Sequence, residues 1–236
     1  MTAPAIAAEV AECSMGGRLG IGGRLVLRNA YVDAVPGTVT ALVGRVGAGK
    51  TTLFEVLVGR RHPTVGQVRW QGARVARPSL AALSRRGLIY LPDREWLPRK
   101  RRLGEVISLA AAARRSDWEP LVQPLGLAPR DQRIGTLTVG ELRLAEVAFG
   151  LARRPRVLVA DEPFRSLDPR HRDRVGGALR GLARDGAAVL FADHDAERVR
   201  DTADRLFAIE QGATRLVEGF RDRPIVEWYQ PWPAAG

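Results

Sequence analysis

Residues 44–52 read Gly44-Arg45-Val46-Gly47-Ala48-Gly49-Lys50-Thr51-Thr52, and this stretch determines how the rest of the chain is interpreted. It fits the pattern G-x-x-x-x-G-K-[ST], in which glycines let the backbone wrap around phosphate groups that a Cβ would obstruct. The apolar, β-branched residues 39–43 before it predict a buried strand, and residues 52–58 after it predict a helix. Strand, glycine loop and helix together predict a site for a nucleoside triphosphate.

All nine residues of this loop are candidate nucleotide contacts. Lys50 is expected to reach the β- and γ-phosphates, and the Thr51 hydroxyl to bind Mg²⁺. The start of the following helix turns free N–H groups and a positive dipole end toward the same anion. An ordinary glycine-rich turn is the alternative, and the patterns on both sides of the loop argue against it.

The composition bounds the class of protein. The chain has 236 residues, of which 45% are hydrophobic and 27% charged, which suits a globular protein with a full core. Its formal net charge of +11 favours anionic partners such as lipid surfaces, nucleic acid or nucleotides. One cysteine, Cys13, excludes an internal disulfide framework. The first residues do not resemble a signal peptide, and no apolar run approaches the roughly 20 residues of a membrane helix, so any membrane crossing is expected from another chain.

Further patterns predict an α/β chain. Strands are expected at residues 24–34, 87–91, 157–160 and 187–191, with hairpins around Gln71-Gly72 and Gln211-Gly212. Residues 103–153 predict a helical lobe inserted into the sheet domain, and residues 169–184 predict another helix. Residues 1–15 are expected to be a loosely ordered lead.

A second chemical pattern is Val157-Leu158-Val159-Ala160-Asp161-Glu162. An apolar strand that ends in an acid places a carboxylate at the ligand crevice of a parallel sheet. Asp161 is expected to orient Mg²⁺, and Glu162 to polarise the attacking water. An Asp-Glu pair after an apolar run is common, and the phosphate loop is what makes this one informative.

Three further motifs occur in a specific order. Leu137-Thr138-Val139-Gly140-Glu141 lies before Asp161 and opens a helix, Ser166-Leu167-Asp168 follows the acid, and Asp193-His194-Asp195 follows the next strand. With the phosphate loop, this set resembles the ATP-binding cassette (ABC) family, the motor domains of ABC transporters. The resemblance extends from about residue 24 to residue 217.

The resemblance implies a role for each motif. Residues 44–52 correspond to Walker A, and residues 157–162 to Walker B with Glu162 as the catalytic base. Residues 137–141 correspond to the signature motif, and residues 166–168 to the D-loop. His194 corresponds to the switch histidine that contacts the γ-phosphate.

The family also implies an architecture. It has an α/β fold of the P-loop NTPase type, with a mostly parallel sheet, an antiparallel β region and an inserted helical subdomain. Here that subdomain is expected at about residues 94–155, within a single domain of residues 16–236. Two cassettes, identical or different, would enclose two ATP molecules and Mg²⁺ head to tail, each ATP between Walker A of one and the signature of the other. ATP would then drive dimer closure.

A transmembrane permease subunit is the expected partner. It would hold the chain, otherwise cytoplasmic, at the inner face of the cell membrane. A basic run lies where such a partner is expected to dock, and it consists of Arg94, Arg99, Lys100, Arg101 and Arg102. Nucleic acid is not an expected partner.

Four features depart from the family pattern. Thr138 replaces the usual serine of the signature, a mild change because the hydroxyl is kept. Val139 stands where the first signature glycine is usual, and a β-branched residue restricts the backbone. Asp93 replaces the glutamine of the Q-loop and could bind Mg²⁺ directly or through water. The aromatic residue that stacks on adenine is missing, with only Leu19 and Ile21 near its expected place.

Two alternatives to a transporter ATPase remain at this point. One is a soluble cassette ATPase that acts on nucleic acid, although the long coiled coil or second cassette usual in that class is missing here. The other is a module that closes on ATP with little hydrolysis, which Val139 and Asp93 would explain.

Overall fold

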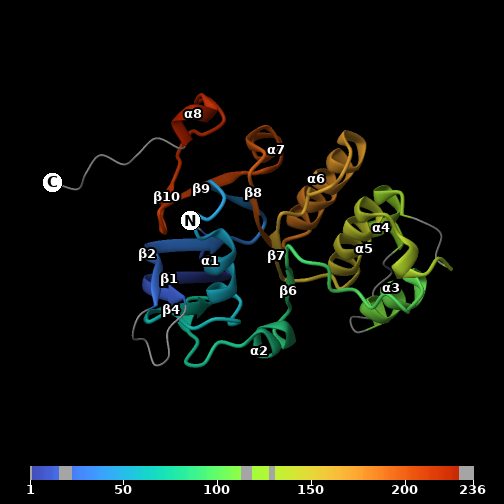
Figure 1. Ribbon diagram of the computed structural model, residues 1–236, viewed down its shortest axis with the longest axis horizontal. Helices are drawn as coiled ribbons and strands as arrows, with labels where there is room; N and C mark the ends of the chain where they lie inside the picture. Colours follow the sequence, from blue (N-terminus) through green and yellow to red (C-terminus); the bar gives the residue numbers. More distant parts are fainter. Residues whose placement is uncertain (1, 16–22, 113–118, 128–130, 229–236) are drawn as a thin grey trace.

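The computed structural model of the protein describes residues 2–15, 23–112, 119–127 and 131–228 (Figure 1). Its strands are β1 (Ile6–Met15), β2 (Arg24–Ala34), β3 (Val39–Val43), β4 (Val65–Trp70), β5 (Ala73–Arg74), β6 (Leu88–Leu91), β7 (Val157–Asp161), β8 (Ala188–Asp193), β9 (Arg205–Glu210) and β10 (Ala213–Leu216). Its α-helices are α1 (Lys50–Leu57), α2 (Leu80–Arg85), α3 (Leu103–Ala112), α4 (Glu119–Val122), α5 (Val139–Ala152), α6 (Pro169–Arg184), α7 (Ala196–Thr202) and α8 (Ile225–Trp228).

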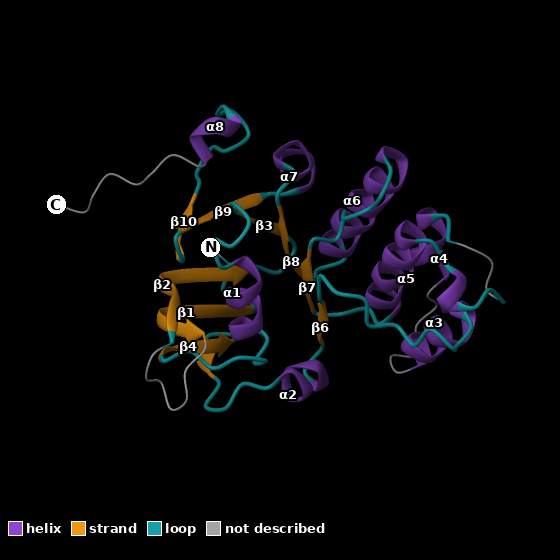
Figure 2. Ribbon diagram, in the orientation of Figure 1, coloured by secondary structure: helices purple, strands orange, loops and turns teal. Residues whose placement is uncertain are grey.

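The larger of two sheets has six strands in the order β10-β9-β3-β8-β7-β6. All neighbours in it are parallel except β10, which pairs antiparallel with β9. The smaller sheet has the order β2-β1-β4-β5 and is antiparallel. The mostly parallel sheet, the antiparallel region and both predicted hairpins are therefore confirmed (Figure 2).

Successive residues of each parallel strand pack into two different hydrophobic cores. In β6, Leu88 and Tyr90 belong to the core that includes α1 and the antiparallel sheet, whereas Ile89 and Leu91 belong to the core that includes α3, α5 and α6. Side chains of a strand alternate between its faces, so both faces of this sheet need apolar residues. This explains why the strands appear in the sequence as unbroken apolar runs.

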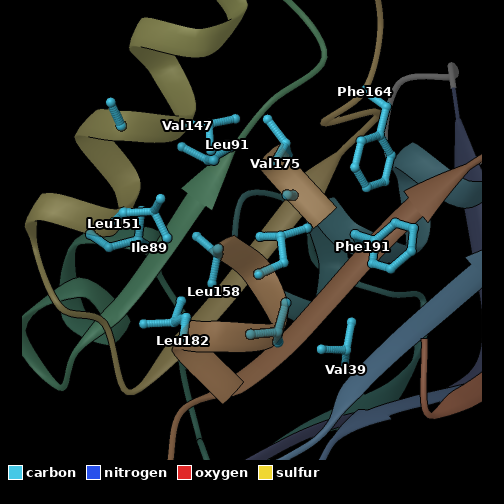
Figure 3. Packing of buried hydrophobic residues seen from close by; sticks show 14 of the residues in the cluster. Val39, Ile89, Leu91, Val147, Leu151, Leu158, Phe164, Val175, Leu182 and Phe191 are labelled. Atoms are coloured by element: carbon cyan, nitrogen blue, oxygen red, sulfur yellow. The ribbon is translucent and has the colours of Figure 1, made fainter. Parts of the chain in front are cut away.

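Helix α5 connects the helical region to the sheet. Val147 and Leu151 of α5 lie in one apolar cluster with Ile89 and Leu91 of β6 (Figure 3). The same helix also contacts α3, α4 and α6 (Figure 1). Of these helices, α3, α4 and α5 fall within the subdomain expected at about residues 94–155, whose bounds stay a prediction, and α6 lies outside it. Among the described residues, no helix combines the length and the apolarity that crossing a membrane requires.

The N-terminal segment differs from the expectation. The prediction that residues 1–15 form a loosely ordered lead is wrong, because Ile6–Met15 is β1 and pairs with both β2 and β4. Ile6, Val10 and Cys13 are buried there. Alanine-rich segments have low intrinsic β-propensity, and here two neighbouring strands supply the hydrogen bonds and packing that the local sequence does not indicate.

The two sheets meet between β2 and β10. The Thr214 hydroxyl accepts a hydrogen bond from Tyr31 N and donates one to Tyr31 O, each at 2.6 Å. Further along, Arg28 N donates to Gly212 O at 2.9 Å, and Gly212 N donates to Ala48 O at 3.1 Å. The turn before β10 therefore ties the antiparallel sheet to the phosphate loop.

The burial of β1 makes a testable prediction. Ile6→Ala should lower the free energy of unfolding by about 2–5 kcal/mol, because it leaves a cavity at a side chain that is fully buried. Glu12→Ala, at an exposed position of the same strand, should change it by less than about 0.5 kcal/mol. Chemical denaturation of both variants measures the difference, and equal small effects would contradict the role of β1.

Candidate active site

Four adjacent parallel strands end at one edge of the sheet. In the order β3, β8, β7, β6, they are followed by the phosphate loop, His194, Glu162 and Asp93. Parallel strands place their carboxyl ends side by side, which is where open α/β sheets bind ligands. Motifs far apart in the sequence are thereby collected at one place.

The phosphate loop has the backbone that its glycines predict. Gly49 is the N-cap of α1 with φ of 112°, a conformation that other residues rarely adopt, and a Cβ there would lie 2.8 Å from Leu27 Cδ2. Lys50 is 7% exposed, and its Nζ donates to Gly44 O at 2.7 Å and Arg45 O at 3.2 Å. The ammonium group is thus held over the loop rather than in solvent.

Thr51 and Asp161 join the loop to β7. The Thr51 hydroxyl donates to Asp161 Oδ2 at 2.7 Å, and Asp161 is 1% exposed. Burial raises the pKa of Asp161 to about 6, against the opposing effect of this hydrogen bond. Burial likewise lowers the pKa of Lys50, although Glu162 and Asp161 oppose that shift. The charged forms of Asp161 and Lys50 are therefore both disfavoured in the nucleotide-free protein.

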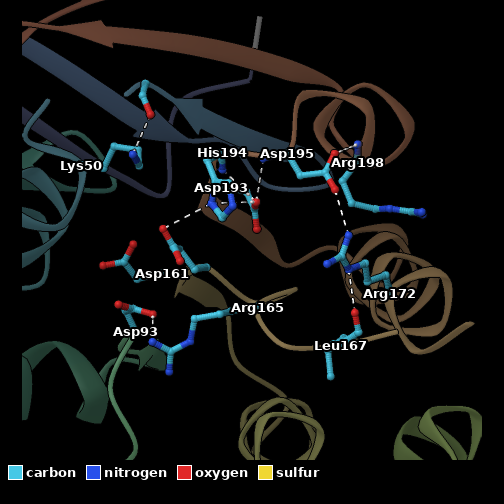
Figure 4. A network of polar contacts seen from close by, with 12 residues as sticks. Lys50, Asp93, Asp161, Arg165, Leu167, Arg172, Asp193, His194, Asp195 and Arg198 are labelled. Atoms are coloured by element: carbon cyan, nitrogen blue, oxygen red, sulfur yellow. Dashed lines mark hydrogen bonds and ion pairs between the residues drawn. The ribbon is translucent and has the colours of Figure 1, made fainter. Parts of the chain in front are cut away.

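Glu162 and His194 face each other across the edge. His194 Nδ1 lies 3.5 Å from Glu162 Oε1 and 3.7 Å from Asp193 Oδ1 (Figure 4). Asp193 Oδ1 accepts hydrogen bonds from His194 N and Asp195 N at 2.8 and 2.9 Å, which fixes the backbone that carries the histidine. Glu162 itself has φ of 49°, a left-handed conformation that is unfavourable for a side chain with a Cβ.

Asp93 makes an ion pair that the sequence did not indicate. Arg165 Nη1 lies 2.7 Å from Asp93 Oδ1, with both side chains partly exposed (Figure 4). The pair links the segment after β6 to the segment after β7. Within the described parts of the chain, no three His, Cys, Asp or Glu side chains are grouped closely enough to hold a metal ion by themselves.

A cavity of about 1150 Å³ opens at this edge. Its lining includes the loop residues 45–52 together with Asp93 and Glu162. It also includes residues that the sequence interpretation missed, from β1, β2 and the β9–β10 turn: Met15, Arg24, Leu25, Val26, Arg28, Gln211 and Gly212. No local motif marks them, because only the pairing of β1 and β2 brings them to the loop. Leu19 and Ile21 lie outside the described residues.

The signature residues form the start of α5. Thr138 is the N-cap, its Oγ1 accepts from Glu141 N at 3.3 Å, and Glu141 Oε2 accepts from Thr138 N at 2.8 Å. This reciprocal capping box explains the Thr and Glu of the motif. Val139 has helical backbone and a side chain that is 57% exposed, so its β-branching causes no strain. A Cβ on Gly140 would lie 2.9 Å from Ser166 O, so only glycine permits this approach.

The D-loop residues lead into α6. Ser166 has φ of 60°, Leu167 is buried, and Asp168 caps α6 by accepting from His171 N at 2.9 Å. Arg172 donates to Leu167 O at 2.8 Å and to Asp195 Oδ2 at 3.1 Å (Figure 4). The structure thus brings Walker A, Walker B, Asp93 and His194 to one edge, whereas neither residues 137–141 nor residues 166–168 line the cavity.

The fold and the site agree with a family comparison. The model of the family described as ABC transporter matches residues 27–165, which include the phosphate loop, the signature and Walker B. The chain belongs to the ABC transporter family. It is an ATP-binding and ATP-hydrolysing subunit of that family, as its motifs predicted.

Curated ABC proteins cover most of the chain. The lipopolysaccharide export system ATP-binding protein LptB of Acidithiobacillus ferridurans is 32% identical over 80% of this chain and 82% of its own length. The zinc import ATP-binding protein ZnuC of Halorhodospira halophila is 35% identical over 81% of this chain and 70% of its own. One named protein exports and the other imports, so this similarity does not assign a direction of transport here.

Solved ABC structures have the same fold. An ATP-binding subunit of an ABC transporter has a TM-score of 0.79 at 22% identity and covers 94% of this chain and 97% of its own. The cassette MJ0796, in a dimeric post-hydrolysis state with ADP and Pi, has a TM-score of 0.78 at 18% identity and covers 91% of this chain and 99% of its own. The predicted ABC ATPase fold is therefore confirmed.

The raised pKa of Asp161 predicts a pH dependence of stability in the nucleotide-free protein. The pKa of Asp161 is about 6 in the folded protein, against an ordinary 3.8, so the folded state favours the protonated carboxyl. This contribution to the free energy of unfolding is fully present below about pH 4 and is lost as the pH rises through 6. Two pKa units correspond to roughly 3 kcal/mol, so Asp161→Asn should exceed wild type in stability by up to that amount at pH 7 and by little at pH 4. Urea denaturation at each pH measures this, and a difference independent of pH would contradict it.

Proposed function

We propose that this ABC ATPase closes with a second cassette around two ATP molecules and thereby powers a separate transmembrane permease. The observation that carries the proposal is the separation of the motifs within one chain. Loop residues 45–52 and Glu162 line the cavity, whereas residues 137–141, at the capped start of α5, are not among the described residues that line it. A second cassette, identical or different, would bring such a helix start to each ATP.

The residues at this edge of the sheet suit ATP with Mg²⁺. The glycine loop, Lys50 and the start of α1 present donors to phosphate groups, and Thr51 and Asp161 present adjacent oxygens. Asp193 Oδ2, among the described side-chain atoms, is buried without a hydrogen-bonding partner, which fits a site that completes its contacts when loaded. When bound, Mg²⁺ would neutralise phosphate charge. We assign Thr51 and Asp161 to hold it, with Asp93 as a further ligand if its pair with Arg165 opens.

Glu162 is the proposed general base and His194 the proposed switch residue. The Glu162 carboxylate lines the cavity and lies beside the His194 ring, so it can accept a proton from water attacking the γ-phosphate. His194 is 61% exposed at its side chain and can turn toward the phosphate as the dimer closes. Residues 137–141 and the D-loop residues Ser166, Leu167 and Asp168 would contact the partner cassette's nucleotide.

The proposed membrane contact involves the segment after Asp93. Trp96 packs edge-on against Phe149 of α5 at 4.8 Å between ring centroids, and Leu97 is buried. The basic residues of this segment lie near Trp96 and Leu97 in the sequence, and Arg99, Lys100 and Arg101 among them are exposed. A helix of a permease could dock here, which would hold the chain at the cytoplasmic membrane face, and the basic charge would favour anionic lipid nearby.

Glu162→Gln tests the base. It keeps the shape and removes the carboxylate, so turnover should fall by at least about 100-fold while ATP affinity stays within about twofold. Phosphate release and titration with a fluorescent nucleotide measure the two quantities. Release at the wild-type rate would remove Glu162 as the base.

Lys50→Ala is the matched contrast. It removes the ammonium group from the phosphate loop and should weaken ATP binding itself by about tenfold or more. If this variant bound ATP as tightly as wild type, the assignment of the loop to the phosphates would be wrong.

The membrane contact makes a separate prediction. Exposed charges are screened within about 8 Å at physiological ionic strength, so attachment by charge alone should be lost on washing with salt. Attachment to a permease through the apolar contact at Trp96 should survive washing and require the permease. Retained protein is measured on membranes with and without the permease. Retention that needs no permease and disappears with salt would contradict the proposal, and duplex DNA that stimulates the ATPase would favour the nucleic-acid alternative.

A further inference from the structure

A charged pair is buried where α5 meets the catalytic edge of the sheet. Arg143 Nη1 lies 2.9 Å from Glu146 Oε2, and each side chain is 2% exposed. Removing two charges from water is unfavourable, and apolar residues of similar volume often stabilise a core as well or better. Stability alone is therefore a weak reason for this pair, and its other contacts indicate what it does.

Arg143 binds the backbone that carries the Walker B acids. Its Nε and Nη2 donate to Glu162 O at 3.2 and 2.9 Å, and Nη2 also donates to Asp161 O. Its Nη1 donates to Pro92 O at 3.0 Å, directly before Asp93. A guanidinium group is planar and always charged, so it can hold several oxygens in a fixed arrangement. One side chain thus joins the ends of β6 and β7.

Glu146 orients this guanidinium group. It lies three residues after Arg143 on the same face of α5. Its second oxygen, Oε1, accepts a hydrogen bond from Trp96 N at 3.2 Å, so the carboxylate is itself held in place. Neither Arg143 nor Glu146 lines the nucleotide cavity, which excludes direct contact with ATP as their role.

The backbone that Arg143 binds is strained. Glu162 has φ of 49°, and a residue with a side chain stays in this left-handed region only when its surroundings hold it there. On one side, Glu162 N donates to Ala192 O at 2.9 Å. On the other side, the carbonyls of Asp161 and Glu162 both accept from Arg143. Glu162 O also accepts from Arg165 N at 3.2 Å. Without the guanidinium group, Asp161 O would lose this donor and Glu162 O would keep the bond from Arg165 N.

We propose that Arg143 is a positioning residue for ATP hydrolysis. By binding the carbonyls of Asp161 and Glu162, it holds the left-handed turn that directs the Glu162 carboxylate into the nucleotide cavity. Glu146 holds the Arg143 guanidinium group in position through their ion pair. The inference rests on the proposed role of Glu162 as the base. It adds to that role by naming Arg143 as the residue that aligns Glu162. Arg143 lies on α5, the helix that begins with the signature residues.

The test separates positioning from stability. Arg143→Met leaves Glu146 as an unpaired buried charge, so it should lower both the melting temperature and turnover. Arg143→Met combined with Glu146→Leu removes both charges, so its melting temperature should recover. Arg143→Lys keeps the positive charge but not the planar guanidinium group that can donate to several oxygens at once. Leu151→Ala, a buried apolar residue near the other end of α5, serves as the matched control for loss of packing.

We expect kcat of Arg143→Met to fall at least about tenfold, with KM and the affinity for ATP unchanged within about twofold. The double variant should regain its melting temperature but keep the low kcat, because the guanidinium group that binds both carbonyls is still missing. Arg143→Lys should have an intermediate kcat. Leu151→Ala should lower the melting temperature and leave kcat within about twofold of wild type.

Two results would overturn the inference. One is a kcat that recovers together with the melting temperature in the double variant, which would mean that the pair acts only on stability. The other is a wild-type kcat in Arg143→Met. Glu162→Gln is measured in the same series to distinguish failure of this inference from failure of the base assignment. Turnover that survives in Glu162→Gln would overturn the role of Glu162 itself.

Discussion

The structure depends on the common direction of β3, β8, β7 and β6, whose carboxyl ends meet at one edge of the sheet. This parallel register places the phosphate loop, His194, Glu162 and Asp93 together at one edge of the sheet, although they are far apart in the sequence. It also requires apolar cover on both faces. The helices α5 and α6 on one face, and α1 with the antiparallel sheet on the other, supply that cover.

Burial at this edge shifts the pKa values of three ionisable groups. Asp161 and Asp193 are buried and have raised pKa values, and the buried Lys50 has a lowered one. Each carboxyl is therefore more costly to ionise in the nucleotide-free protein than in water. In the proposed complex, Mg²⁺ would compensate the negative charge of these carboxylates, and the phosphate groups would compensate the positive charge of Lys50. This is a physical basis for a ligand that shifts the population of states.

Helix α5 links three functions along its length. Its capped start carries the signature residues, its middle carries Arg143 against the Walker B carbonyls, and its later turns pack on β6. A rotation of the helical region would thus move the signature and the support of Glu162 together. Contact between Glu146 and Trp96 extends this link to the segment where a permease is proposed to dock.

The sequence by itself determined the elements with strong local patterns. Gly44, Lys50 and Thr51 in their spacing indicated the phosphate loop, and apolar runs ending at Asp161 and near His194 indicated parallel strands and their acids. Only the tertiary structure decided the rest. β1 owes its order to two neighbouring strands and not to its alanine-rich sequence, and Met15 reaches the cavity only through that pairing. Arg143 and Arg165 have no motif, because their roles come from contacts with backbone and side chains distant in the chain. Local periodicity reports which face of an element is apolar, but long-range packing decides which polar groups meet.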